Sequence, residues 1–191
     1  MFNNMCKAER KLEAFRYILT RFVAHQRVLT PASSDVEVFN SFSNKRLMKL
    51  LYLLCLESVP YEGLDEIGLF KVFDNMIAYP YGPVEQDVYD GLWLIKGVEY
   101  KDGKFESLPN EDNGGDIEHE LQCSIDTAFD KLVDRLGNTF LDTERLINIV
   151  HSLYLWPKTY VSSSDKSMDV NNKDELIKEK NVYKQIVSKS A

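Results

Sequence analysis

The sequence predicts a mainly α-helical fold with a small β-hairpin, an α+β arrangement in which a compact helical domain surrounds a buried central helix. Apolar residues recur at helical spacing along most of the chain, residues 47–56 carry a single charge, and residues 98–107 alternate around an Asp-Gly pair. The 191 residues correspond to one domain plus an extension, at about 150 residues per domain. An apolar fraction of 44% argues against a fully disordered chain.

The first predicted helix covers residues 7–28, and Pro31 follows it as a breaker. Its apolar stripe consists of Leu12, Phe15, Ile18, Leu19, Phe22 and Val23. We expect residues 1–40 to form this amphipathic N-terminal helix and a linker. Because the stripe must be buried, it packs either on its own domain or on a second chain, so an oligomer formed through this helix is one option.

The central helix is predicted to begin at Ser43 or Asn44, either of which can cap it, and to run to Leu56. Its apolar positions lie on all sides, which indicates burial by several neighbours. Cys55, inside this run, is expected to be a small core residue. The helix opens the main domain, which we place at residues 41–160.

The stretch that follows is predicted to be helical or mixed over residues 64–78, and Tyr79-Pro-Tyr-Gly-Pro-Val84 is then expected to form a rigid turn. Pro83 suits the first turn of the next helix, where its missing N–H has no partner to lose. Glu85 and Asp87 would then lie at the positive end of that helix. Its apolar stripe is Val84, Val88, Leu92 and Ile95.

Strands are predicted at 98–101 and 104–107, joined by a tight turn at Asp102-Gly103, with a loop at 108–115. Further helices are expected at 116–136, 142–155 and about 173–188, with Trp156-Pro157 ending the second of them. The last part of the chain, residues 161–191, is expected to be a mobile polar linker followed by the C-terminal helix.

The charge balance argues against a general nucleic-acid or membrane-surface binder, because 23 basic and 30 acidic side chains give a net charge of −7. Residues 1–30 nevertheless carry +4, and residues 111–134 carry −7. The acidic segment, with Glu85 and Asp87, can oppose a basic partner surface or form a solvated helix face.

The three cysteines are widely spaced and form no CxxC pair, the N-terminus lacks a signal-peptide layout, and the longest apolar run, 50–56, is too short for a membrane span. We therefore expect a cytoplasmic chain with reduced thiols and no membrane partner.

No phosphate-binding, zinc-protease or hydrolase motif is present, and the acidic residues form no compact metal-binding pattern. We expect no catalytic residue, metal or cofactor, and hence a protein that is not an enzyme. His25, His119 and His151 lie far apart in the sequence. His151 is either a site residue or a helix residue bonded to a backbone carbonyl.

The stretch at residues 78–89 is the most informative. Two prolines and a glycine in five residues stiffen the backbone that carries Tyr79 and Tyr81. Rigid tyrosines are good contact residues because they offer area at low entropic cost. The alternative is a structural corner whose tyrosines are packed into the domain.

Three elements of the chain resemble the Panacea-domain antitoxin family, the phage-associated GepA/SocA-like proteins. They are Lys45-Arg-Leu-Met-Lys-Leu-Leu-Tyr52, then Ala78-Tyr-Pro-Tyr-Gly-Pro-Val84 with Val88-Tyr89, and His151 followed by Trp156. The resemblance covers about residues 43–160. The Tyr-Gly-Pro-Val and Val-Tyr part is the most specific.

The resemblance implies a mostly helical domain with a small β element, and a role as the antitoxin of a toxin–antitoxin or prophage system. Such a protein neutralises a protein toxin encoded nearby by direct contact, or acts as an adaptor that delivers the toxin to a protease. The expected partner-binding residues are Tyr79, Tyr81, Gly82, Pro83, Val84, Asp87, Tyr89, His151 and Trp156.

Other functions stay open beside this one. A DNA-binding regulator would act through the basic 1–30 segment, but one helix is no helix-turn-helix and the net charge is unfavourable, so nucleic acid is not expected as a partner. An enzyme with an unrecognised site would centre on Tyr52, Tyr81 and His151. A structural or phage-assembly role is the remaining option.

Overall fold

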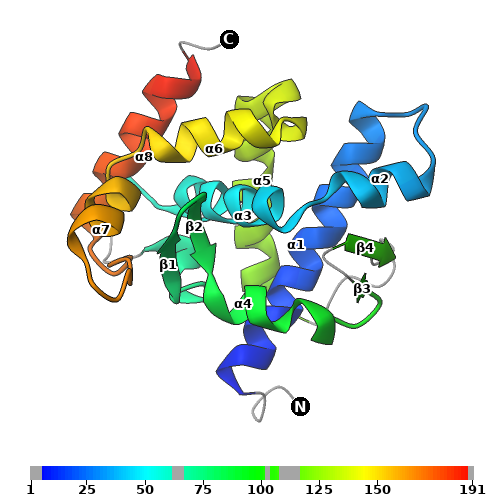
Figure 1. The fold of residues 1–191 in the computed structure, drawn as a ribbon, viewed down its shortest axis with the longest axis horizontal. Coiled ribbons are helices and arrows are strands. Elements are labelled where there is room, and N and C mark those ends of the chain that lie inside the picture. The colour runs from blue at the N-terminus through cyan, green and yellow to red at the C-terminus, as the bar shows by residue number, and fades with distance from the viewer. Residues whose placement is uncertain (1–5, 62–66, 102–103, 108–116, 189–191) are drawn as a thin grey trace. The chain divides into compact units, whose positions relative to one another are not determined.

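The computed structural model describes residues 6–61, 67–101, 104–107 and 117–188. Over these residues the chain is mainly helical with small antiparallel hairpins, which confirms the predicted class (Figure 1). It divides into a first unit, residues 1–44 and 87–122, and a second unit, residues 45–86 and 123–191. This division differs from the three consecutive segments expected from the sequence, because each unit combines stretches that are distant along the chain.

The first unit begins with α1 (Lys7–Leu29), close to the predicted 7–28, and buries its apolar stripe. The other elements are α2 (Asp35–Ser41), α4 (Gln86–Gly91), η2 (Leu92–Leu94), β3 (Glu99–Lys101), β4 (Lys104–Ser107) and the start of α5. Helix α2 was not predicted from the sequence, and its capping box joins Ser34 and Glu37 reciprocally. Figure 1 shows α2 packed beside α1 and β4.

The α4 segment of the first unit lies against α1. A Cβ at Gly91 would stand 2.7 Å from a methyl carbon of Leu12, so the two segments approach closely. Asp87, in the first turn of α4, forms an ion pair with the buried Lys11. The predicted helix from Pro83 to Ile95 is wrong at both ends, because α4 starts at Gln86 and gives way to a 3-10 turn after Gly91.

Strands β3 and β4 confirm the predicted hairpin. The turn at Asp102-Gly103 and the expected loop at 108–115 lie outside the described residues.

The second unit is built around α3 (Asn44–Ser58), in which every residue from Arg46 to Glu57 is buried. This confirms the predicted central helix, including a core position for Cys55, whose thiol pKa is raised by burial. The remaining elements are η1 (Gly68–Lys71), β1 (Met76–Tyr79), β2 (Gly82–Glu85), most of α5 (His119–Leu136), η4 (Gly137–Leu141), α6 (Thr143–His151), α7 (Leu155–Ser162) and α8 (Lys173–Ser188).

A hairpin of β1 and β2 replaces the helical or mixed segment predicted before Tyr79 and the helix turn predicted at Pro83. Pro83 pairs with Ala78 in the antiparallel register, and Tyr79 pairs with Gly82, which leaves Pro80 and Tyr81 as a two-residue turn. A strand of four residues has too few alternating apolar and polar positions to be distinguished from a helix by sequence pattern alone.

The predicted helix at 142–155 is two helices, because α6 ends at His151 and α7 begins at Leu155. Pro157 therefore lies in the first turn of a helix instead of ending one. His151 and Trp156 consequently belong to different helices, with a sharp change of direction between them (Figure 1).

The polar stretch at 161–172, expected from the sequence to be a mobile linker, makes backbone hydrogen bonds to β1. Lys166 accepts a backbone hydrogen bond from Ala78 (2.8 Å), and Met168 donates one to Met76 (2.8 Å), so this segment lines the free edge of β1. Met168 and Val170 are also buried, and these two apolar side chains hold an otherwise polar stretch in place. The C-terminal helix α8 confirms the one predicted at 173–188.

Polar residues of α8 enter the interior of the second unit. Glu179 is fully buried and accepts hydrogen bonds from the Tyr52 hydroxyl (3.0 Å) and from the backbone N–H groups of Tyr154 (2.7 Å) and Leu155 (3.1 Å). It thereby caps the N-terminus of α7. The ammonium of Lys180 caps the C-terminus of α3 by donating to the carbonyl of Glu57 (2.8 Å).

None of the helices in the described ranges combines the length and the apolar character that crossing a membrane requires.

Candidate functional site

The candidate site is the hairpin tip, Tyr79–Gly82, whose backbone is fixed by side chains from three helices. The Trp156 indole N–H of α7 donates to the carbonyl of Tyr79 (2.8 Å). The His151 ring, at the end of α6, hydrogen-bonds the backbone of Pro80, which has only its carbonyl to offer. The Lys49 ammonium of α3 donates to the carbonyl of Pro83 (2.8 Å). The turn is therefore held on both strands.

Gly82 is required by this packing. Its φ is +107°, and a Cβ there would lie 2.7 Å from a methyl carbon of Val150 and 2.9 Å from Cε of Lys49. A side chain at this position would be strained in its backbone and would collide with α6 and α3. The Gly-Pro pair at 82–83 thus lets the strand lie directly on the two helices.

Stacked rings support the other side of the tip. His151 lies flat on Trp156, with ring centroids 4.0 Å apart and an interplanar angle of 7°, and Trp156 stacks on Tyr160 at 5.1 Å. Trp156 is only 8% exposed. Nε2 of His151 is buried and has no hydrogen-bond partner among the described residues. The late His and Trp of the sequence therefore support the tip from below, the His through the backbone bond expected as one of its two roles.

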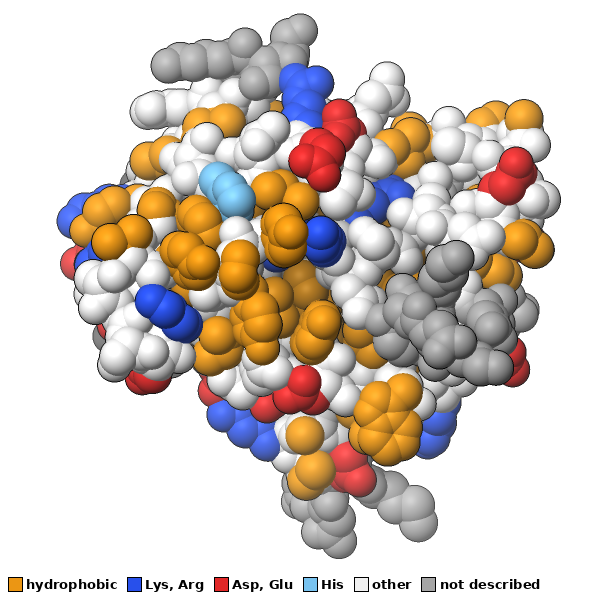
Figure 2. Space-filling model, viewed as in Figure 1, with side chains coloured by type: hydrophobic (Ala, Val, Ile, Leu, Met, Phe, Trp, Pro, Cys, Tyr) orange, Lys and Arg blue, Asp and Glu red, His pale blue; other side chains and the backbone are white. Residues whose placement is uncertain are grey.

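The tyrosine rings of the tip face outward on this support. Tyr79 is 38% exposed and donates from its hydroxyl to Gln86 (3.0 Å), and Tyr81 is 53% exposed. The Lys45 ammonium stands 3.6 Å from the centroid of the Tyr81 ring. Figure 2 shows hydrophobic side chains gathered over the β1–β2 hairpin and α7, with a histidine at their edge and basic side chains among them. We call Tyr79, Tyr81 and Lys45, together with the neighbouring exposed side chains of α7, the hairpin surface of the second unit.

Two titratable groups beneath the tip are shifted toward their neutral forms. Burial, aided by the charge of Lys45, lowers the pKa of Lys49 to about 7. Burial and the charge of Lys49 lower the pKa of His151, although the bond to Pro80 opposes the shift. Lys49 and His151, beneath the tip, therefore carry less positive charge than free side chains would, whereas Lys45 is an exposed cation.

The buried Lys49 should make stability depend on pH. Its pKa is lowered on folding from 10.5 to about 7, so between these values the unfolded chain binds more protons and stability rises with pH. Relative to Lys49→Met, the free energy of unfolding of the wild type should increase from about pH 7 to about pH 10, by at most about 1.4 kcal/mol per pH unit. Below pH 7 the difference should be constant.

Urea denaturation of both proteins over this pH range measures the difference, in which other titrating groups cancel. Lys131→Met, at an exposed position of α5, is the matched control for the loss of a lysine. A pH-independent difference for Lys49→Met would contradict the proposed burial of this ammonium.

The other predicted site residues take different places. Val84 is 7% exposed and Pro83 is buried, so both support the tip instead of facing a partner. Asp87 and Tyr89 belong to the first unit, on α4, where Tyr89 is 39% exposed. The second unit alone thus brings together the remaining seven of the nine expected residues.

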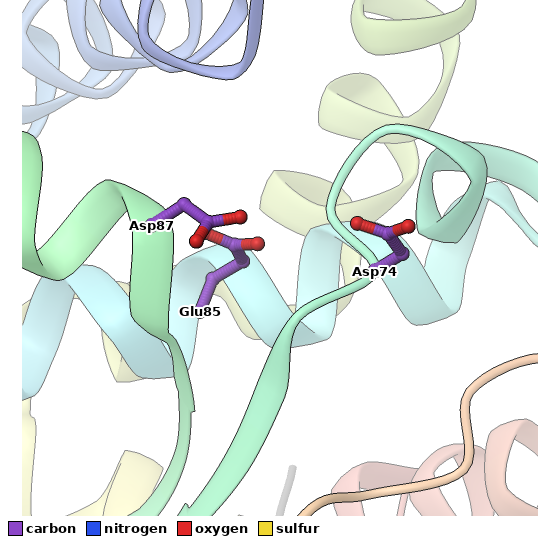
Figure 3. A group of neighbouring side chains, drawn as sticks. All are labelled: Asp74, Glu85 and Asp87. Carbon is purple, nitrogen blue, oxygen red and sulfur yellow. The ribbon is translucent and has the colours of Figure 1, made fainter. Parts of the chain in front are cut away.

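Glu85 is not the partner-facing acid expected from the sequence. It is 1% exposed at the end of β2, and its carboxylate accepts a hydrogen bond from the backbone of Asn75 (3.2 Å). Figure 3 shows it across from Asp74, on the loop that leads into β1, and the third side chain drawn there, Asp87, belongs to the first unit. Two carboxylates in one unit fall short of the oxygen ligand set of a hard cation, and we assign no metal to them.

The enzyme hypothesis had grouped Tyr52, Tyr81 and His151. Tyr52 is fully buried, bonds Glu179 and meets Phe70 edge-on, and its pKa is raised by burial, so its hydroxyl is committed to the core. Tyr81, in contrast, faces outward. Lys45 and Lys49 were not predicted as site residues, although two lysines four residues apart in an apolar helix are a usable signal.

Comparisons of the chain with protein-family models, with curated proteins and with solved structures find no match.

Proposed function

We propose that this chain is a protein-binding module of the antitoxin type, which neutralises a toxin encoded nearby by direct contact through the hairpin surface. The observation that carries the proposal is the outward presentation of Tyr79 and Tyr81 on a turn that side chains of three helices hold by hydrogen bonds. Ordering such rings on binding costs little conformational entropy, which suits interface anchors. The antitoxin role itself rests on the motif resemblance.

Tyr81→Ala should abolish protection while the chain stays folded. The test co-expresses the small open reading frame beside this gene with the wild type, with Tyr81→Ala, or with Trp93→Ala, and measures growth and complex formation. An anchor truncated to alanine costs about 2 kcal/mol or more of binding free energy, roughly thirtyfold in Kd. Trp93, 67% exposed in the first unit, is the matched aromatic control.

Two results would contradict the proposal. A neighbouring reading frame that is harmless when expressed alone removes the toxin. A Tyr81→Ala chain that protects as well as the wild type removes the hairpin surface as the contact.

A further inference from the structure

The hairpin surface carries lysine ammonium groups against its aromatic rings. The pairs, with the distance from Nζ to the ring centroid, are Lys45–Tyr81 (3.6 Å), Lys158–Tyr154 (5.2 Å) and Lys166–Tyr160 (5.3 Å). Each pair places a positive charge beside an aromatic ring. Basic side chains are visible among the hydrophobic ones in Figure 2.

Lys45 differs from the other two lysines in its surroundings. Lys158 forms an ion pair with Glu175 (2.8 Å), and the Lys166 ammonium donates a hydrogen bond to the carbonyl of Tyr160 (2.6 Å). Lys45 is exposed, and no carboxylate of the described ranges lies within ion-pair distance of it. Its neighbour one turn along α3 is another lysine, Lys49. Among the described residues, a positive charge without an ion-paired carboxylate therefore stands beside Tyr81, the more exposed ring of the tip.

Resting on the proposed function, we infer that the hairpin surface binds an acidic segment of the partner protein. Carboxylates of that segment pair with Lys45, and its apolar side chains cover Tyr79 and Tyr81. This is the reverse of the basic partner expected from the acidic helix. The net charge of −7 describes the whole chain, but pairing across an interface is decided by charges within about 10 Å, the Debye length.

Single-stranded nucleic acid also binds surfaces of lysines and aromatic rings, by stacking its bases on the ring faces. Here one face of Tyr81 is already covered by Lys45, so it offers less stacking area. The chain also lacks the overall positive charge that draws a polyanion. An acidic peptide needs only the local cation and the ring edges, and the observations favour it.

The experiment pans a display library of random dodecapeptides against the immobilised full-length chain, in parallel with Tyr81→Ala, Lys45→Glu and Lys131→Glu chains. Lys131→Glu reverses the charge at an exposed position of α5 and is the matched control. Circular dichroism of each variant checks folding. The enriched peptides are then synthesised, their Kd values are measured at two salt concentrations, and an oligo(dT) strand is titrated alongside.

We expect enriched peptides rich in Asp and Glu that need Tyr81, that lose affinity about tenfold or more with Lys45→Glu, and that keep it with Lys131→Glu. Enrichment that needs Tyr81 but selects basic or neutral peptides overturns this inference and leaves the proposed function standing. Peptides that bind the Tyr81→Ala chain as well as the wild type count against both the inference and the proposed function. The absence of any peptide enriched on the wild type above the Tyr81→Ala chain counts against both as well. Tighter binding of oligo(dT) than of any peptide, abolished by Lys45→Glu, overturns the inference in favour of nucleic acid.

Discussion

Glu179→Ala is expected to lower the free energy of unfolding by about 3 kcal/mol, because one fully buried carboxylate satisfies three donors. Removing it leaves the Tyr52 hydroxyl and the backbone N–H groups of Tyr154 and Leu155 without their acceptor, and Tyr52 and Leu155 are buried. Burial raises the pKa of Glu179, and the bonds from Leu155 and Tyr154 oppose that shift by favouring the charged form. Urea denaturation followed by circular dichroism measures the loss.

Two matched variants separate this effect from a general loss of a carboxylate on α8. Glu175→Ala removes an acid one turn away that pairs with the exposed Lys158, and should cost less than about 1 kcal/mol. Tyr52→Phe removes one of the three donors and should cost about 1 kcal/mol. A Glu179→Ala chain as stable as Glu175→Ala would contradict the capping role.

The same substitution should weaken the hairpin surface. Tyr154 and Leu155 begin α7, and the next residue, Trp156, holds the carbonyl of Tyr79. When the helix start loses its cap, the indole is less firmly placed. Stability and partner binding are therefore expected to fall together in this variant, whereas Tyr81→Ala should affect binding alone.

Gly82→Ala is expected to cost about 3 kcal/mol of stability and to abolish partner binding. The methyl group would meet Val150 and Lys49 at 2.7 and 2.9 Å while the backbone holds a φ of +107°. To relieve the overlap, the strand must move away from α6 and α3, and the tip moves with it. The measurements are the urea midpoint and the Kd for the partner.

Gly137→Ala is the matched control for this substitution. Gly137 also has a positive φ, +47°, but a Cβ there would meet nothing within 4 Å. It should show only the backbone cost of about 1 kcal/mol and unchanged partner binding. If both alanine variants lose the same stability, the close packing of Val150 and Lys49 around Gly82 is not the reason why a glycine is needed there.

The candidate site could be located from the sequence but not assembled from it. The dense prolines and glycine at 80–83 marked a stiff segment, and the His and Trp at 151 and 156 were singled out with it. The strand identity of Pro83 was missed, since four residues carry too little periodicity and a proline fits both a strand edge and a helix start. The contact between Lys45 and Tyr81 could not be predicted from the sequence, because the side chains that meet across a turn depend on tertiary packing.

The helical class, the central helix, α1, α8 and the β3–β4 hairpin could be predicted from sequence pattern, because long periodic stretches and an Asp-Gly turn act through local preferences. Packing between distant segments, in contrast, is what buries Glu85, places residues 166–168 along β1, and brings Lys49, His151 and Trp156 to one turn. Those outcomes depend on hydrogen bonds and contacts between residues that are far apart in the chain, such as Met76 and Met168, and no local pattern encodes them.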